Sequence, residues 1–316
     1  TKSIYGTTVL NNEGVMNFQS TAYLYLFGDA TLNNTVSGVI DFQDNAVISY
    51  SGGGTFSFNN AGLLTKTIIA GTSLIFPPTT NSGTIDVQMG ELEFIGSFGF
   101  NNTIDGIVKG IATIDLPPVA NFTNDGTFAP GASPGVLTVL GDFKSSSSSI
   151  LDIELDGLTQ GTEYDLLNIT GTNVIFDGTV NVALGFDANI GDTFTIATVS
   201  GIIAAKNLTT PVYADYGCKQ YTFDITYPGD NEVLLTISDK LDIEPPTVAT
   251  QNIVVQLDAS GNASITADQI DNGSVDNCTL PENLIFVLDI TDFTCSDLGD
   301  NTVSLTVTDE ASNFAS

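Results

Sequence analysis

The stretch NNTIDGI (101–107) is one of six segments in which Asn is followed shortly by Gly and then by an apolar residue. The others are NNEGV (11–15), NNTVSGV (33–39), NNAGL (59–63), NSGTI (81–85) and TNDGTF (123–128). Their glycines recur at nearly equal intervals: Gly14, Gly38, Gly62, Gly83, Gly106 and Gly126. A turn that recurs with nearly one period predicts a repeated structural unit. Because Asn and Gly occupy the same position in each turn, we expect backbone angles with positive φ there, which these two residues adopt at low cost.

Short runs of alternating apolar and polar residues lie between these turns and predict β-strands with one buried face. The runs are AYLYLF (22–27), GVIDF (38–42), AVISY (46–50), GTFSF (54–58), TIDVQ (84–88) and ELEFI (91–95). A period of about 22 residues that contains two or three strands fits one coil of a parallel β-solenoid. An antiparallel sandwich or barrel of the same strands is the alternative, but its turns have no need to recur at one period.

The sequence changes character near residue 240. SDKLDIEPPTVAT (238–250) has two prolines and several acids, which predicts a stiff linker. Strands are then expected at NIVVQL (252–257), ASITA (263–267), LIFVLDI (284–290) and NTVSLTVTD (301–309). We therefore predict an all-β chain with two parts. A right-handed parallel β-helix covers 1–240, with regular coils to about 143 and terminal coils over 144–240, and a small immunoglobulin-like β-sandwich covers 241–316.

Charge and composition exclude several classes of function. The chain has 316 residues with 37 acidic residues against seven Lys, a net charge of −30, and no Arg, His or Trp. Binding to nucleic acid or anionic lipid needs a cationic surface, so neither partner is expected. Without His and Arg, the commonest general base, the commonest zinc ligand and the bidentate anion clamp are missing. Apolar runs are far shorter than the roughly 20 residues of a membrane-spanning helix, so none is expected.

The Gly-rich stretch FTNDGTFAPGASPGV (122–136) could bind a phosphate or form a turn of the solenoid. A phosphate-binding loop requires Gly-Lys-Ser/Thr before a helix. Here no Lys follows, two prolines interrupt the stretch, and the next segment has a strand pattern. We therefore interpret it as the sixth Asn-Gly turn of the stack.

Two resemblances extend this interpretation. The elements PGASPGVL (130–137), the Ser run with ILDIELDG (144–157) and YDLLNITG (164–171) resemble the last coils of autotransporter-type passenger β-helices and of large Bacteroidota surface proteins, over about 120–202. The segments EPPTV, QNIVVQLDASGNASITADQIDNGSVDNCT, FTCSDLGDNTVSLTVTD and EASN, from about 242 onwards, are similar to hyalin-repeat (HYR-like) immunoglobulin-fold modules. The chain ends before the last strand of that pattern, so we expect a truncated module of a longer surface protein.

Three cysteines raise the question of pairing. Cys278 and Cys295 lie close together in the sequence within the HYR-like part, and we expect them to form a disulfide if the protein is extracellular, with two free thiols as the alternative. The loop-entropy model assigns such a bond about 3 kcal/mol. Cys218 has no evident partner and is expected to be a small buried apolar residue, because no His is present to activate it.

Calcium is the one metal that the residue types favour. Oxygen ligands from loops suit Ca²⁺, whereas a chain without His and with three Cys does not favour zinc. Acidic residues near the expected strand ends and linker are the candidate ligands: Asp242, Glu244, Asp271, Asp276 and Asp309. No EF-hand spacing is present, and solvated turn acids are the simpler alternative.

Catalysis is not expected. A glycoside hydrolase could use two carboxyls, and Asp152, Glu154 and Asp165 are the candidates. Asp152 and Glu154 alternate with apolar residues, however, so they share one face of a strand, most simply the solvent face. We expect an extracellular, non-catalytic adhesive or structural segment whose partners are glycans, surfaces or other copies of the protein. The Bacteroidota resemblance implies export to the outer-membrane surface by the type IX pathway and a role in adhesion or gliding motility. A filament protomer, a polysaccharide-active enzyme and an ice-binding solenoid with a flat Thr-x-Thr ladder are the alternatives.

Overall fold

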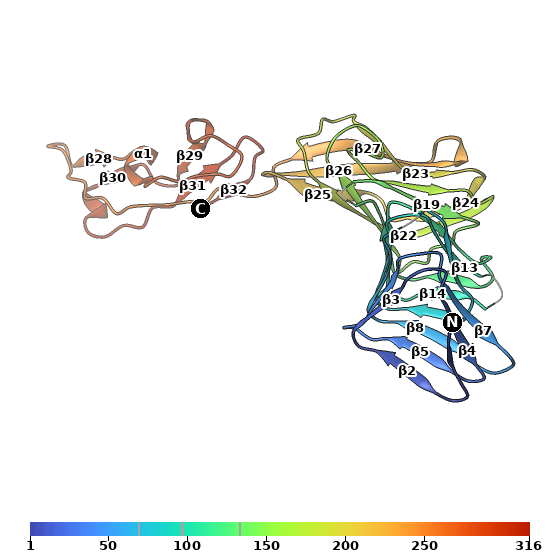
Figure 1. The fold of residues 1–316 in the computed structure, drawn as a ribbon. Helices are drawn as coiled ribbons and strands as arrows, with labels where there is room; N and C mark the ends of the chain where they lie inside the picture. The colour runs from blue at the N-terminus through green and yellow to red at the C-terminus, as the bar shows by residue number, and fades with distance from the viewer. Residues whose placement is uncertain (69, 96–97, 133) are drawn as a thin grey trace. The chain divides into compact units, whose positions relative to one another are not determined.

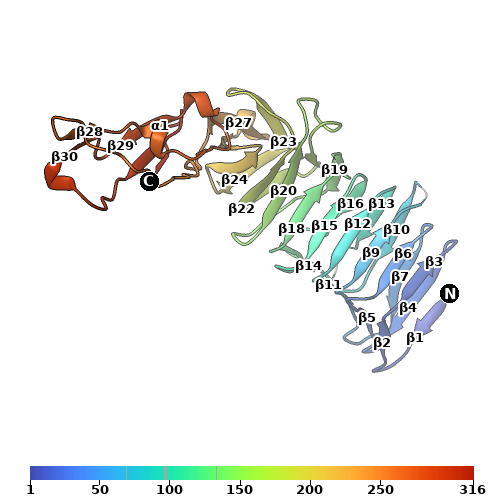
Figure 2. The same ribbon diagram turned by 90° about the vertical axis from the view of Figure 1, so that its left-hand side faces the viewer.

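The computed structural model describes residues 1–68, 70–95, 98–132 and 134–316. It divides into two compact units (Figures 1 and 2). The first comprises Thr1–Ala214 with Thr222–Asp239, and the second comprises Asp215–Tyr221 with Lys240–Ser316. The hairpin segment 215–221 therefore packs with residues that come much later in the chain.

The first unit is a β-solenoid of about six regular coils, each contributing one strand to each of three sheets (Figure 2). The six-stranded sheet contains β2 (Val9–Asn12), β5 (Thr31–Asn34), β8 (Ser57–Asn60), β11 (Thr79–Asn81), β14 (Phe100–Asn102) and β17 (Phe122–Asn124). The nine-stranded sheet contains β3 (Val15–Phe18), β6 (Val39–Phe42), β9 (Leu63–Lys66), β12 (Thr84–Val87), β15 (Ile107–Gly110), β18 (Thr127–Pro130), β20 (Ile150–Leu155), β22 (Asn173–Leu184) and β24 (Ile202–Leu208).

The twelve-stranded sheet closes the coils and continues past them. Its parallel strands are β1 (Lys2–Ile4), β4 (Tyr23–Phe27), β7 (Val47–Ser51), β10 (Thr72–Ile75), β13 (Glu91–Phe94), β16 (Thr113–Asp115), β19 (Val136–Leu140), β21 (Leu166–Ile169) and β23 (Thr193–Val199). The sheet then adds β27 (Glu232–Leu241), β26 (Lys219–Thr226) and β25 (Val212–Tyr216), and β27 runs antiparallel to β23. The parallel solenoid is confirmed, and the alternative of an antiparallel sandwich for this part is wrong.

The interior of the coils is filled by one apolar side chain above another, because successive coils pair in register. Phe100 stacks on its register partner Phe122 with ring centroids 5.8 Å apart, and on Phe94 of the preceding strand in the chain at 4.2 Å. In the nine-stranded sheet, Ile85 lies between Leu64 and Val108 of the adjacent strands. All three of these side chains are fully buried. Alternation along each strand thus directs successive side chains inside and outside, and most of the inward side chains are apolar.

A ladder of buried Asn side chains marks the corner after the six-stranded sheet. Its members, all almost completely buried, are Asn12, Asn34, Asn60, Asn81, Asn102 and Asn124. Each Nδ2 donates to the Oδ1 of the Asn in the next coil, at 2.7–2.8 Å. The Nδ2 of Asn124 faces the hydroxyl of Ser149 at 3.4 Å, where the regular coils end. The recurring Asn therefore satisfies polar groups between coils, which buried amides require.

The recurring glycines serve close approach of the backbone, so the expectation of positive φ is wrong for them. None of the six repeated glycines has a positive φ. A Cβ at Gly62 would lie 2.2 Å from the carbonyl oxygens of Gly38 and Thr35 in the preceding coil. At Gly14, in the first coil, a Cβ would meet nothing within 4 Å. The glycine is thus required where one coil stacks on another.

The second unit contains two small antiparallel sheets. One pairs β28 (Asn262–Ser264) with β30 (Asp292–Thr294), and the other is formed by β29 (Ile285–Leu288), β31 (Leu305–Thr308) and β32 (Phe314–Ala315). A short helix, α1 (Ala267–Ile270), and the 3₁₀ turns η1 (Pro228–Asp230) in the first unit and η2 (Pro281–Asn283) and η3 (Cys295–Asp297) in the second complete the elements.

A small apolar core holds the second unit together. It is built from Ile265, Ile270, Leu284, Leu305 and Val307. The strand expected at 252–257 is absent, because this segment forms no ladder with a neighbouring strand in the described structure. Among the described residues, no helix is long and apolar enough to cross a membrane.

Candidate functional site

The outward face of the six-stranded sheet carries a regular row of polar side chains. We call it the outer polar row; it consists of Asn11, Asn33, Asn59, Thr80, Asn101 and Thr123. Adjacent members are direct partners in the strand register from β2 to β17. Strand pairing spaces them at about 4.8 Å. The row is therefore a regular array of amide and hydroxyl groups that spans six coils.

Hydrogen bonds between neighbours hold several members of this row in place. Asn33 donates from Nδ2 to the Oδ1 of Asn11 at 2.9 Å, and Asn59 donates in the same way to Asn33. The hydroxyl of Thr123 donates to the Oδ1 of Asn101 at 2.6 Å. Ordered side chains lose less conformational entropy when they bind a ligand.

The six strands that carry the outer polar row contain no charged residue, although the chain carries a net charge of −30. The other outward positions of the same six strands are Val9, Thr31 and Ser57, and no charged residue occurs in any of these strands. Acidic residues instead lie on the outward faces of the other two sheets, for example Asp86 in β12 and Glu91 in β13. This face is thus suited to a neutral, hydrogen-bonding partner.

Sequence reasoning missed the outer polar row because it assigned the recurring Asn to a turn. The available signal was the pair Asn-Asn at 11–12, 33–34, 59–60 and 101–102. Two adjacent residues of a strand point to opposite faces. In each pair the first Asn therefore lies outside and the second joins the buried ladder. An ice-binding face with two parallel Thr rows does not match this mixture of Asn and Thr.

Two of the three candidate catalytic carboxyls, Asp152 and Asp165, accept hydrogen bonds, and beside burial the charges of Glu154 and Asp152 both contribute to raising the pKa of Asp165. Asp165 is 1 % exposed and accepts backbone N–H groups from Glu154 and Gly135, each at 2.8 Å. Burial raises its pKa to about 6, against the two hydrogen bonds. Asp152 lies on the outward side of β20 and accepts from Asn181 at 2.6 Å. The buried carboxylate of Asp165 thus connects two segments of the terminal coils by hydrogen bonds to their backbone.

A cluster of three acidic side chains, which we did not predict from the sequence, lies on the outward face of the twelve-stranded sheet. Glu91, Glu93 and Asp115 each place a carboxylate oxygen within 4.8 Å of the others. Burial, then the charges of Asp115 and Glu91, raise the pKa of Glu93, and burial and Glu91 raise the pKa of Asp115. Thr72 donates to Glu91 at 3.3 Å. All three carboxyls are half-buried on a sheet surface.

An open hollow of about 810 Å³ lies at the N-terminal end of the solenoid. It is lined by residues of the first coil, including Ile4, Leu10, Phe18 and Leu24, and its described lining contains neither Asp nor Glu. The apolar side chains of the first described coil face this hollow. Its lining offers none of the carboxyl pairs that glycoside hydrolysis uses.

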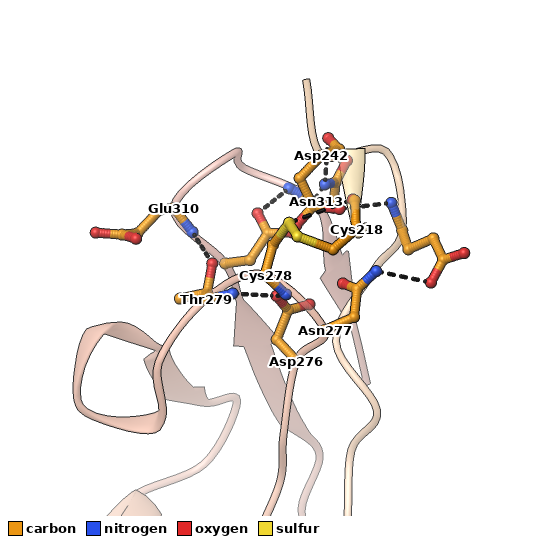
Figure 3. The surroundings of a disulfide bond; sticks show 10 residues. Cys218, Asp242, Asp276, Asn277, Cys278, Thr279, Glu310 and Asn313 are labelled. Carbon is orange, nitrogen blue, oxygen red and sulfur yellow. Dashed lines mark hydrogen bonds between the residues drawn. A yellow bond between two sulfur atoms is a disulfide. The ribbon is translucent and has the colours of Figure 1, made fainter. Parts of the chain in front are cut away.

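The disulfide joins Cys218 to Cys278, so the expected Cys278–Cys295 bond is wrong, as is the expectation of an unpaired Cys218 (Figure 3). Their Cα atoms are 5.5 Å apart, within the range for a disulfide. Cys218 lies in segment 215–221, which belongs to the second unit despite a separation of 60 residues. Cys295 is exposed, with its sulfur near the carbonyl of Gly261 at 3.7 Å.

Three of the five candidate calcium ligands come together beside this disulfide. Asp242, Asp276 and Asp309 each place a carboxylate oxygen within 4.8 Å of the others. Figure 3 shows Asp242 and Asp276 near the Cys218–Cys278 bond, with Asn313 beside Asp242. We call these three the carboxylate cluster.

The other two candidates lie outside the carboxylate cluster. Glu244 accepts from the side chain of Asn277 at 2.9 Å. Burial acts to raise the pKa of Asp271, but hydrogen bonds from the side chain and backbone of Ser274 and from the backbone of Gly273 and Asn272 lower it overall. Both residues therefore have local partners of their own.

Comparisons with known proteins do not assign a family: no family model matches the chain, and no curated protein matches it. The interpretation of function consequently depends on the geometry described above.

Proposed function

We propose that the chain is a non-catalytic, extracellular adhesive segment of a large bacterial surface protein, and that the outer polar row binds neutral glycans. In this proposal the solenoid is a right-handed parallel β-helix, and the second unit is an immunoglobulin-like module of the HYR-like type. Export by the type IX pathway and a role in attachment or gliding belong to the same proposal, through the resemblance of residues 120–202 and 242–316 to such proteins.

The observation that carries the proposal is an uncharged hydrogen-bonding row on a chain of −30 charge. Glycans present hydroxyl groups that both donate and accept hydrogen bonds, and amide and hydroxyl side chains match this chemistry. A regular row with a spacing of about 4.8 Å offers several equivalent contacts to an extended chain. Many weak contacts on one rigid face produce avidity.

A further observation supports an extracellular location. A disulfide such as Cys218–Cys278 persists in oxidising compartments and is rare in the cytosol.

The test is binding of the oxidised chain to a panel of neutral and acidic polysaccharides, measured by pull-down on insoluble glycans and by glycan array. The variant N59D/N101D places two negative charges on the outer polar row at exposed positions, so the fold should persist. We expect it to lose about tenfold or more in affinity for a neutral glycan, because each charge must be desolvated at the contact.

The matched control is N17D/T179D, which adds the same charge on the outward face of the nine-stranded sheet. It should bind as the unchanged chain does. Equal binding by both variants, or binding to no glycan, would overturn the assignment of this face. Release of reducing sugars would instead establish an enzyme, and concentration-dependent fibres in sedimentation and electron microscopy would establish a filament protomer.

A further inference from the structure

The carboxylate cluster is built from three segments of the second unit. Asp242 follows the end of β27, Asp276 lies in the loop that carries Cys278, and Asp309 directly follows β31. Asp309 is only 2 % exposed. Three acidic side chains with oxygens inside 4.8 Å repel one another strongly where water is excluded.

Each carboxylate is oriented by donors that occupy part of its oxygen surface. The Oδ1 of Asp276 accepts the N–H groups of Cys278 and Thr279 at 2.9 and 2.6 Å. The Oδ1 of Asp242 accepts the N–H of Glu244 at 3.1 Å. Asn313 donates from its backbone and its side chain to Asp309, at 2.7 and 2.8 Å. The carboxylates are therefore held in fixed positions before any ligand binds.

Two oxygens of the cluster are buried and have no hydrogen-bond partner: the Oδ2 atoms of Asp242 and Asp276. A buried carboxylate oxygen without a donor or a cation is unfavourable and is rare in native structures. These two orphaned oxygens are an observation independent of the clustering, and they indicate that a cation completes the site.

We propose that Asp242, Asp276 and Asp309 bind one calcium ion. Oxygens bound to a single Ca²⁺ at about 2.4 Å lie at most about 4.8 Å apart, so one ion can contact all three carboxylates. The ligand set contains only oxygen, because the chain has no His and Cys278 is engaged in the disulfide. Such a set favours a hard cation over zinc. Mg²⁺ demands a tighter octahedron and retains its waters, which suits three loop carboxylates less well.

The ion and the disulfide fasten the same loop. Cys278 lies shortly after Asp276, and Asn313 also donates to the backbone oxygen of Asp242 at 3.1 Å. Calcium would thus connect the residue after β27, the disulfide loop and the turn after β31. The apolar core of the second unit is small, so we infer that bound calcium sets the stability of this unit. A ligand that binds only the folded state shifts unfolding to a higher temperature. The site stands on its own geometry and does not depend on glycan binding.

The test uses the oxidised full chain after treatment with a chelator. Isothermal titration with CaCl₂ should reveal one site, with a dissociation constant of roughly 10⁻⁴ to 10⁻³ M as in other extracellular modules, and weaker binding of MgCl₂. D242N and D276N preserve the shape of the side chain and the Oδ1 acceptor. Each should weaken calcium binding by about tenfold or more, because each removes one ligand charge.

The control D268N removes an exposed acid of the same unit outside the cluster and should bind as the unchanged chain does. Thermal unfolding separates a metal site from a structural role. Calcium should raise the midpoint for the second unit in the unchanged chain and not in D276N, while without calcium D276N should be at least as stable. The proposal is overturned if no stoichiometric binding occurs, if D268N and D276N bind equally, or if Glu91→Gln alone abolishes binding.

Discussion

Asn60 and its neighbour Asn59 allow the buried Asn ladder to be tested within one strand. Both belong to β8, and they point to opposite faces. Asn60 is 1 % exposed, accepts from Asn34 at 2.7 Å and donates to Asn81 at 2.7 Å. Asn59 is exposed and donates to Asn33 at 2.9 Å. The substitutions N60A and N59A therefore share the same chemistry and the same strand.

The structure sets the expected magnitudes. N60A leaves the buried Oδ1 of Asn81 without its donor, while the Nδ2 of Asn34 keeps its bond to the carbonyl of Leu63 at 3.0 Å. One orphaned buried acceptor costs about 1–3 kcal/mol, and the other lost bond costs about 1 kcal/mol. We expect N60A to lower the free energy of unfolding by about 2–4 kcal/mol. N59A exposes its partner to water and should cost less than about 0.5 kcal/mol.

The assay is urea unfolding of the oxidised chain, followed by far-UV circular dichroism. A midpoint about 1 M lower is expected for N60A, with little change for N59A, if the slope is about 3 kcal/mol/M. Because solenoids can unfold in segments, the midpoint of the first transition is the quantity to compare. The reasoning is refuted if the two variants differ by less than about 0.5 kcal/mol.

Three further predictions use other features of the structure. Gly62→Ala should destabilise the solenoid by about 2 kcal/mol or more in the same urea assay, whereas Gly14→Ala should be tolerated, since only Gly62 is covered by a preceding coil; equal effects would exclude close approach as the reason for the repeat. The raised pKa of Asp165, about 6, means that the folded chain holds a proton which the unfolded chain releases above pH 3.8. The free energy of unfolding should therefore be higher below pH 3.8 and should fall by about 2–3 kcal/mol as the pH rises to about 6. D165N should lack this fall in its pH profile of stability, and identical profiles for the two chains would contradict the burial argument. Loss of the 60-residue link by Cys218→Ser should cost about 4 kcal/mol for the second unit, while Cys295→Ser should change nothing, as thermal unfolding can check; the opposite ranking would restore the pairing of Cys278 with Cys295.

The periodic part of the fold could be predicted from the sequence because its information is local. Each coil repeats one Asn-Gly corner, and the alternation within runs such as 91–95 directly gives buried Leu92 and Phe94. The reason for the glycines was wrong, since it lies in the preceding coil and not in the backbone angles of the turn. The strand expected at 252–257 was wrong for a related reason: its apolar residues are not paired with a neighbouring strand.

The candidate sites were predictable only in part. Loop acids after strands gave Asp242, Asp276 and Asp309 among the calcium candidates, since residue type and position are written in the sequence. That these three converge while Glu244 and Asp271 do not depends on contacts between distant segments. The disulfide shows the same limit: sequence separation favoured Cys295 as the partner of Cys278, whereas the β25–β26 hairpin brings Cys218 to it from 60 residues away.

The sequence by itself determined an all-β chain with a nearly constant coil period, an acidic surface and oxygen ligands as its only metal chemistry. Periodicity and composition are properties of the amino-acid sequence, so they can be read without knowledge of the fold. Only the tertiary structure decided which Asn of each pair is buried and which strands form the sheet without charged residues. It also decided which cysteines form the disulfide and which carboxylates lie within reach of a single ion. Those outcomes depend on stacking register and on distances between residues far apart in the chain.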